Sequence, residues 1–179
     1  AIDGNDGSKY LNFARTNTGI IVTPQSVSTV ASITLGTAND AVERDPASFI
    51  LYGTNETIVS ADNSTGDVET WTEIASGDLT LPDTRNTPGT VVNIENSTEY
   101  TSYKLIFPTV KGNGNSMQIA EIQFFSAADA GGDAILSSVD AVIAVHAPTP
   151  PEGADEDGWI HAAFVYDGAT DTGSIYLNG

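Results

Sequence analysis

The chain of 179 residues contains 24 acidic residues, six Lys or Arg and no Cys, and its net charge is −18 at pH 7. Nucleic acid binding and membrane insertion are not expected, because phosphate binding requires clustered Lys and Arg and because no apolar run is long enough to cross a bilayer as a helix. The excess of acids indicates either adaptation to a salty medium or neutralisation by divalent cations, and we expect an extracellular, secreted protein of prokaryotic origin that folds without disulfides.

Short runs of β-branched and aromatic residues alternate with Gly, Pro, Asn and Asp, and almost no stretch has the 3.6-residue period of a helix. This pattern predicts an all-β fold, an antiparallel β-sandwich. The strands predicted for its first unit are Gly19–Thr23, Ser28–Leu35, Ala47–Tyr52, Val68–Ala75, Thr90–Ile94, Thr101–Phe107 and Ser116–Phe125. Long polar loops separate several of them, and ligand specificity is usually carried by such loops.

The Ala/Gly-rich segment 127–134 is typical of a linker, so we place a boundary there between residues 1–126 and residues 135–179. Beyond it we predict strands at Val139–Val145, Trp159–Tyr166 and Ser174–Leu177. Residues 135–179 are too few to form a complete sandwich alone. We therefore expect extra strands of an incomplete second unit. Because Ala1 is not an initiator Met, we also expect a processed chain or a piece of a larger protein.

The opening of the chain has the composition of a cation-binding loop. Its side-chain oxygens, set between glycines, belong to Asp3, Asn5, Asp6 and Ser8. Calcium takes six to eight such oxygens, and glycines allow a loop to turn its carbonyls inward. Glu121, the one carboxylate within the last predicted strand of the first unit, could close the site. The alternative is a plain turn in which the loop side chains bond their own backbone and Glu121 faces solvent.

Residues 1–126 resemble the discoidin, or coagulation factor 5/8 C-type, family of galactose-binding-like jelly rolls. The stretches that carry the resemblance are AIDGNDGSKYLNF, TANDAVERDPASFILYG, and YTSYKLIFP followed by MQIAEIQFF. The resemblance implies an antiparallel jelly-roll β-sandwich, a non-catalytic module that binds glycans or mediates adhesion, often within secreted bacterial enzymes. It also implies a structural Ca²⁺, whose ligands here would be Asp3, Asn5, Ser8, the Ala120 carbonyl and Glu121, with Asp6 as an additional acid.

Members of this family usually begin with a strand before the opening loop. The segment Ile135–His146 resembles such a leading strand and could fill the vacant position. It could do so within its own chain or in a neighbouring molecule, and the second arrangement would be self-association by strand donation. The alternative is that residues 132–179 begin a second repeat. Residues 158–179, with GWIHAAFVYDG and IYLNG, resemble a hairpin of laminin-G or concanavalin-like jelly rolls.

The sequence gives little sign of catalysis. His146 and His161 are the only histidines, no nucleophile motif accompanies them, and zinc is improbable without Cys. Acids are so abundant that a glycosidase-like carboxylate pair would carry no information. We therefore expect no enzymatic activity in this chain.

Glycan binding would use aromatic faces and polar side chains near loops. The candidates are Tyr10, Arg44, Trp71, Arg85 and Asn86. Two of them have other interpretations: Trp71 as a core residue of its strand, and Arg44 as a salt-bridge clamp among the acids of its own loop.

The leading hypothesis is a carbohydrate-binding or adhesion module with a structural Ca²⁺ and a cell-surface polysaccharide as partner. The alternatives are a structural subunit of a surface layer or filament, and an accessory fragment of a secreted polysaccharide-degrading enzyme.

Overall fold

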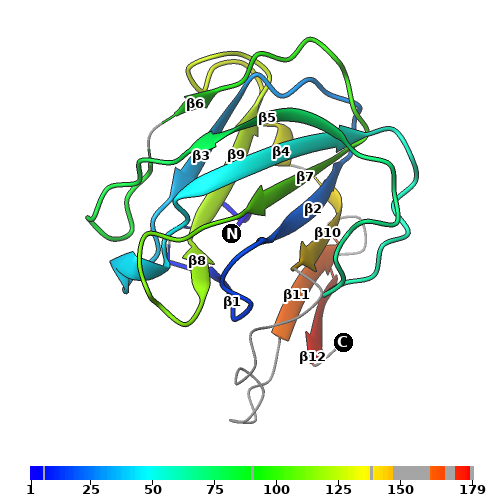
Figure 1. Ribbon diagram of the computed structural model, residues 1–179. Coiled ribbons are helices and arrows are strands. Elements are labelled where there is room, and N and C mark those ends of the chain that lie inside the picture. Colours follow the sequence, from blue (N-terminus) through cyan, green and yellow to red (C-terminus); the bar gives the residue numbers. More distant parts are fainter. Residues whose placement is uncertain (6, 90, 138, 147–161, 168–171, 178–179) are drawn as a thin grey trace.

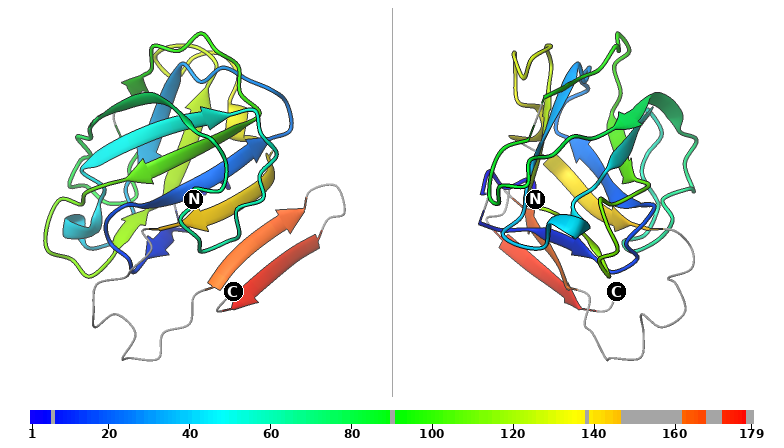
Figure 2. Two further views of the ribbon diagram at one scale, coloured as in Figure 1. Left: turned by 45° about the vertical axis from the view of Figure 1, so that its right-hand side comes forward. Right: turned by 60° about the vertical axis from the view of Figure 1, so that its left-hand side comes forward.

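Two antiparallel β-sheets pack face to face and enclose one apolar core (Figures 1 and 2). The computed structural model describes residues 1–179 apart from 6, 90, 138, 147–161, 168–171 and 178–179. The predicted antiparallel β-sandwich is confirmed. The larger sheet has the order β10-β2-β7-β4-β5, with β2 at Thr18–Pro24, β4 at Ser48–Thr54, β5 at Thr72–Asp78, β7 at Ser102–Phe107 and β10 at Val139–Val145. The smaller sheet has the order β6-β3-β9, with β3 at Ser32–Gly36, β6 at Val92–Asn93 and β9 at Glu121–Phe125.

The core forms where alternate side chains of the two sheets face each other. On β7, Tyr103, Leu105 and Phe107 share one face, as their spacing predicts, and all three are fully buried. On β9, Ile122 and Phe124 are also fully buried. The Phe124 ring meets the Tyr103 ring edge-on, with centroids 5.9 Å apart. Burying each such side chain contributes about 1.5–3 kcal/mol, so this interface is the main source of stability.

The last predicted strand of the first unit is divided at Ala120. Its first part is β8 (Met117–Ile119), which pairs with a short strand that the sequence pattern missed, β1 (Tyr10–Asn12). Its second part is β9, which pairs with β3. The Ala120 N–H donates to Gly36 O at 2.9 Å at the point where the chain changes partners. The alternation of core residues breaks at this crossing, because Met117 and Ile119 before it and Ile122 and Phe124 after it are all fully buried in the core.

β5 begins at Thr72 rather than at Val68, because residues 55–71 form a long loop instead. This loop covers the outer face of the larger sheet. Lys104 points outward from β7, since its neighbours in the strand point into the core, and its Nζ donates to Gly66 O at 2.9 Å. Trp71 is the last residue of the loop and lies outside the strand in which it was predicted.

β10 pairs with β2 of the same chain along its whole length. Its other edge is also bonded within the chain. The Asn63 N–H donates to Ala144 O at 2.9 Å, and the Ala144 N–H donates to Asp62 Oδ1 at 2.8 Å. The structure thus shows the intrachain form of the leading-strand hypothesis. Donation of residues 135–146 to a neighbouring molecule has no support in it.

The segment 127–134, predicted as a linker, is a turn that folds back on the smaller sheet. The Ser126 N–H donates to Asp133 O at 3.0 Å, which closes the turn. A 3-10 helix, η2 (Ile135–Ser137), follows, and its Leu136 side chain is 2% exposed within the core of the sandwich. Residues immediately beyond the predicted boundary therefore belong to the same core as the first unit.

The predicted C-terminal hairpin is present as β11 (Ala162–Asp167) paired with β12 (Thr172–Leu177), and β11 lies next to β10 (Figure 2). Trp159 and His161, which contribute to the laminin-G resemblance, lie outside the described residues. In the described part of the chain no helix has both the length and the apolar character needed to cross a membrane.

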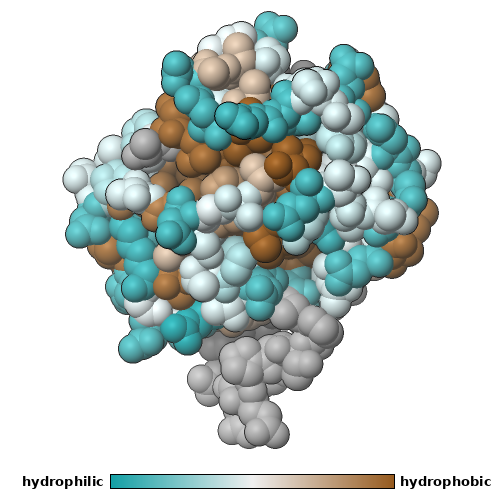
Figure 3. All heavy atoms as spheres, turned by 45° about the horizontal axis from the view of Figure 1, so that its top comes forward, coloured by the Kyte–Doolittle hydropathy of each residue, from teal (hydrophilic) through white to brown (hydrophobic). Residues whose placement is uncertain are grey.

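Apolar side chains reach the surface on the side of the sandwich where the edge strands β5 and β6 lie (Figure 3). Half-buried Ile74 of β5 and Val92 of β6 pack against the core there. The two sheets are not joined by strand pairing along this side, and the core is partly visible between them.

Candidate functional site

The opening loop folds around the carboxylate of Asp3. Ser8 Oγ lies 3.0 and 2.8 Å from Asp3 Oδ1 and Oδ2, and the Asn5 N–H donates to Oδ1 at 3.2 Å. Gly4 has φ +68, a left-handed conformation that glycine adopts without strain. The structure therefore brings together three of the predicted metal ligands, Asp3, Asn5 and Ser8. Asp6 lies outside the described residues.

Glu121 reaches this loop from the start of β9. Its Oε1 accepts hydrogen bonds from the Gly4 N–H at 3.2 Å and from Gln123 Nε2 at 3.0 Å. Its Oε2 is buried and has no hydrogen-bond partner among the described residues, and the same is true of Gln123 Oε1. Two buried oxygens without a hydrogen-bond donor, Glu121 Oε2 and Gln123 Oε1, thus lie beside the Asp3 loop. Ala120, whose carbonyl was the remaining predicted ligand, directly precedes Glu121 and is fully buried.

The two carboxylates of the site influence each other. Burial raises the pKa of Glu121, and the nearby Asp3 carboxylate raises that pKa further. For Asp3, burial alone would raise the pKa, but the Ser8 hydroxyl, the Ala1 ammonium 3.7 Å away and the Asn5 N–H outweigh burial and hold the pKa below its ordinary value. Two carboxyl groups in this relationship repel each other when both are charged, so a shared cation would relieve the repulsion.

The donor set fits a hard cation such as Ca²⁺, which binds carboxylate, amide, hydroxyl and carbonyl oxygens together. Within the described residues no three His, Cys, Asp or Glu side chains come close enough to hold a metal. A site here would therefore combine two carboxylates with neutral oxygens. Gln123 belongs to that set and was not predicted as a ligand. Its position two residues after Glu121, on the same face of the strand, was the available signal.

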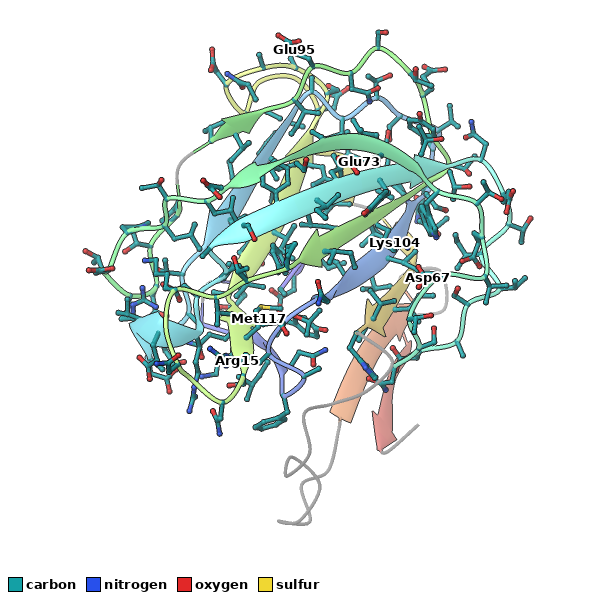
Figure 4. The ribbon with its side chains drawn as sticks, in the orientation of Figure 1. Arg15, Asp67, Glu73, Glu95, Lys104 and Met117 are labelled. Atoms are coloured by element: carbon teal, nitrogen blue, oxygen red, sulfur yellow. The ribbon has the colours of Figure 1, made fainter. Side chains whose placement is uncertain are left out.

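Trp71, a predicted ligand residue, is held against the outer face of the larger sheet. Its ring centroid lies 4.8 Å from Lys104 Nζ, and its Nε1 donates to Gly66 O at 2.8 Å. Lys104 Nζ also pairs with Asp67 Oδ1 at 2.9 Å, and Figure 4 shows these two residues side by side. This cation–π contact secures the 55–71 loop on the sheet, far from the loop of Asp3.

Tyr10 uses its hydroxyl inside the fold. The hydroxyl donates to Gly19 O at 3.0 Å and accepts from Asn12 Nδ2 at 2.6 Å, and burial raises its pKa. A tyrosine engaged in this way joins β1 to β2. Its hydroxyl has no spare proton to donate to a ligand.

The Arg85 side chain forms a salt bridge with a buried carboxylate. Its Nη1 and Nη2 donate to the two oxygens of Asp45 at 2.8 and 2.7 Å, and Asp45 is fully buried. This hydrogen bonding raises the pKa of Arg85. The remaining donors bond the carbonyls of Asp40, Pro82 and Asp83. The guanidinium thus ties two loops together, and the salt-bridge clamp predicted for Arg44 is formed by Arg85 instead. The neighbouring Asn86 is exposed, at φ +50.

Arg44 lies in a 3-10 helix, η1 (Val42–Arg44). A second arginine, Arg15, was not selected by sequence reasoning. Both contact the segment 112–114. Arg15 Nη2 donates to Gly112 O at 2.8 Å, and Arg44 Cγ packs so closely on Gly114 that a Cβ there would lie 2.7 Å from it. Figure 4 shows Arg15 near Met117, at the end of the sandwich where β1 and β8 lie. No periodicity in the sequence marks Arg15, because it belongs to a tight turn between β1 and β2.

Comparison with known proteins supports the fold. No protein-family model matches the chain, and neither does any curated protein. Among solved structures, the CBM32 domain CpGH89CBM32-5 from Clostridium perfringens, in complex with GalNAc-β-1,3-galactose, is 16% identical, with a TM-score of 0.50 over 70% of this chain and 80% of that chain. A CBM32-3 domain from a family 31 glycoside hydrolase of the same organism is 10% identical, with a TM-score of 0.50 over 69% and 78%.

The structure of the CBM32-1 and CBM32-2 domains of Clostridium perfringens ZmpB is 20% identical, with a TM-score of 0.50 over 69% of this chain and 29% of that chain. The fold is a discoidin-like, galactose-binding-like jelly roll. The resemblance drawn from residues 1–126 is thereby confirmed for the fold, whereas identities at this level say nothing of the ligand.

Proposed function

We propose that this chain is a non-catalytic, extracellular carbohydrate-binding module whose opening loop is fastened to the sandwich by Ca²⁺. The observation that supports it most is the fold, shared with CBM32 domains, one of which is complexed with GalNAc-β-1,3-galactose. Because a fold alone does not define a ligand, the second support is the gathering of polar loops at one end of the sandwich.

The loop end of the sandwich offers polar groups on a rigid frame. The buried Asp45–Arg85 pair fixes the loops 37–46 and 82–87 to each other. The segment 111–114 joins them, since Lys111 Nζ lies 3.4 Å from Asp45 Oδ2. Binding by such a preorganised loop cluster costs less ordering entropy than binding by free loops.

The calcium would act on structure and not on chemistry. Asp3, Asn5, Ser8, Glu121, Gln123 and the Ala120 carbonyl would hold it, and it would neutralise the two carboxylates that now face each other.

The test is a glycan array probed with the full chain in millimolar Ca²⁺, followed by titration calorimetry on the glycans retained. Saturable binding of at least one oligosaccharide class, lost on unfolding, is the expected result. Absence of retention across neutral, acidic and sulfated glycans would overturn the proposal. The protein of the array must show a cooperative melt, so that a negative result refers to folded molecules.

A further inference from the structure

Two of the six basic residues differ from the rest. Four have a carboxylate partner: Lys9 on Asp40, Arg85 on Asp45, Lys104 on Asp67, and Lys111 on Asp83 and Asp45. Arg15 and Arg44 have none within 4 Å in the described part of the chain. In a chain with 24 acids, pairing of every cation would be easy to achieve. The two arginines left without a carboxylate occur together, against the same segment 112–114.

The hydrogen bonding of both arginines is incomplete. Arg15 Nη2 donates to Gly112 O at 2.8 Å and lies 3.4 Å from Asn113 Oδ1, both of them neutral acceptors. Arg44 has no side-chain hydrogen bond to a described residue. The Nε of each arginine is buried and has no partner among those residues. A buried donor without an acceptor is unfavourable. The buried Nε atoms are closed to a ligand, so an acceptor from outside would bond the Nη groups of these half-buried side chains.

The backbone around the two arginines is held in a strained form. Arg15 has φ +65, Asn17 has φ +51, and Ala41, which caps η1, has φ +46. Residues with a Cβ adopt this left-handed conformation at a cost, and such positions cluster at ligand-binding sites. The Asn12 carboxamide supports the first turn, since its Oδ1 accepts from the Ala14 N–H at 2.9 Å.

Two acids, Asp40 and Glu43, lie close to this site, and the charge of Arg44 contributes to lowering the pKa of Asp40. Asp40 is held by Lys9 Nζ at 2.8 Å. Glu43, which precedes Arg44, packs on the same segment 112–114, has an exposed side chain and forms no salt bridge with a described residue. The two guanidiniums thus lie on a strongly anionic molecule, with Glu43 on the same segment. Long-range repulsion by the net charge of −18 would oppose any anion, so a bound acid group needs more than one guanidinium.

We propose that Arg15 and Arg44 together bind the acid group of a sugar, so that the preferred glycan is acidic, carrying a carboxylate or a sulfate. This inference rests on the proposed glycan-binding function. A guanidinium presents a planar fork of donors that matches either acid group, and the Asn113 carboxamide is placed to bond a neighbouring hydroxyl. Gly112 and Gly114 leave room for the side chains of Glu43 and Arg44, because a Cβ at Gly112 would clash with Glu43 and a Cβ at Gly114 would clash with Arg44.

The experiment compares matched acidic and neutral probes on the full chain by titration calorimetry. The pairs are trigalacturonate with its methyl ester, and 3′-sulfolactose with lactose. We expect at least tenfold tighter binding of the acidic member of one pair. Which pair shows this difference identifies the preferred acid group as a carboxylate or a sulfate. Arg15→Gln and Arg44→Gln should each remove at least tenfold in affinity. Arg15→Lys and Arg44→Lys keep the positive charge but lose the planar pair of donors. They should therefore recover only part of the affinity that the Gln variants lose.

Equal binding of the acidic and neutral probes, or unchanged affinity in both Gln variants, would overturn the inference. If neutral glycans bind to wild type and to the Gln variants alike, the glycan-binding function stands and only the acidic preference falls. If no glycan of the array binds, both fall together. Each variant must keep the melting temperature of wild type in Ca²⁺, which separates a lost contact from a lost fold.

Discussion

The backbone N–H of Gly4 donates to Glu121 Oε1 at 3.2 Å, a bond between residues 117 positions apart. It places the first loop of the chain on the first residue of β9. On either side of the loop, the Ile122 N–H donates to Ala1 O at 2.6 Å and Lys9 Nζ donates to Gln118 Oε1 at 3.1 Å. The side chains of Asp3, Asn5 and Ser8 bond within the loop itself. The attachment of the loop to the sandwich is therefore the feature that a cation between Asp3 and Glu121 would strengthen.

Calcium should stabilise the protein through this attachment. At about 100 times its dissociation constant, Ca²⁺ should add about 2.7 kcal/mol to the free energy of unfolding. For a chain of this size that corresponds to a rise in Tm of roughly 5–10 °C. The measurement is a thermal melt in millimolar Ca²⁺ and then in excess EDTA at constant ionic strength. Asp3→Asn and Glu121→Gln should each abolish most of the rise.

Glu95→Gln is the matched control for this prediction. Glu95 is an exposed acid at the opposite end of the sandwich from Met117 (Figure 4), and its replacement changes the net charge by the same amount. The Glu95 variant should respond to Ca²⁺ as wild type does. A Tm that is the same in Ca²⁺ and EDTA would leave the opening loop as a simple turn.

Much of the fold follows from alternation of apolar and polar residues. Tyr103, Leu105 and Phe107 were placed on one face, and they form the centre of the core. The predicted range Val139–Val145 agrees with β10 at both ends. Such strands are predictable because a half-buried strand must repeat every second residue. The coming together of Asp3, Asn5, Ser8 and Glu121 was expected both from the oxygen-rich composition of the opening loop and from the resemblance to a family.

The incorrect predictions share one physical cause: tertiary contacts determine where these residues lie and what they bond. β1 has only three residues, and its pairing with β8 depends on a distant part of the chain. Trp71 is an aromatic residue of a type common in strands, but it lies in the loop before β5, where its ring contacts Lys104. Adjacent acids suggested a clamp for Arg44, whereas Asp45 turns inward to Arg85. A sequence without an alignment contains no information on which of several acids a cation will meet.

Loss of Arg85 should destabilise the protein more than loss of the whole buried pair. In Arg85→Met, the fully buried Asp45 keeps only Lys111, whose Nζ lies 3.4 Å from Oδ2. Removing one partner of a buried ion pair costs about 3–5 kcal/mol, because a buried charge is left uncompensated. The double variant Asp45→Leu with Arg85→Met should be less destabilised than Arg85→Met alone. Urea unfolding of the four proteins in this cycle measures the coupling. Additive effects would show that the pair is not coupled.

Glu69 should contribute stability that depends on pH. Its Oε1 accepts from the Val59 and Ser60 N–H groups at 2.6 and 2.7 Å, and its Oε2 accepts from Ser60 Oγ at 2.6 Å. Burial alone would raise the pKa of Glu69, but these hydrogen bonds outweigh burial and lower it. A depressed pKa in the folded state gives stability that is present above the unfolded pKa and is lost as the pH falls through the folded one.

Glu69→Gln should therefore cost about 1–2 kcal/mol at pH 7, because hydrogen bonds to a charged acceptor become neutral ones. The difference from wild type should shrink as the pH falls below 4.5, the ordinary pKa of a glutamate. Urea unfolding of both proteins at a series of pH values measures it. Glu99→Gln, at an exposed acid, should show no such trend. A difference that is independent of pH would mean that the carboxylate charge is not what stabilises the 55–71 loop.

Leu136→Ala tests whether the residues after position 134 belong to the sandwich. Leu136 is 2% exposed and packs in the same core as β7 and β9. Truncation of a buried leucine costs about 2–5 kcal/mol, so the variant should unfold at clearly lower urea concentration in a single transition. Val68→Ala, at a side chain that is 67% exposed, should change the free energy of unfolding by less than about 0.5 kcal/mol. An effect of Leu136→Ala as small as that of Val68→Ala would mean that η2 and β10 are only loosely attached, and would return residues 135–179 to the status of a separate unit.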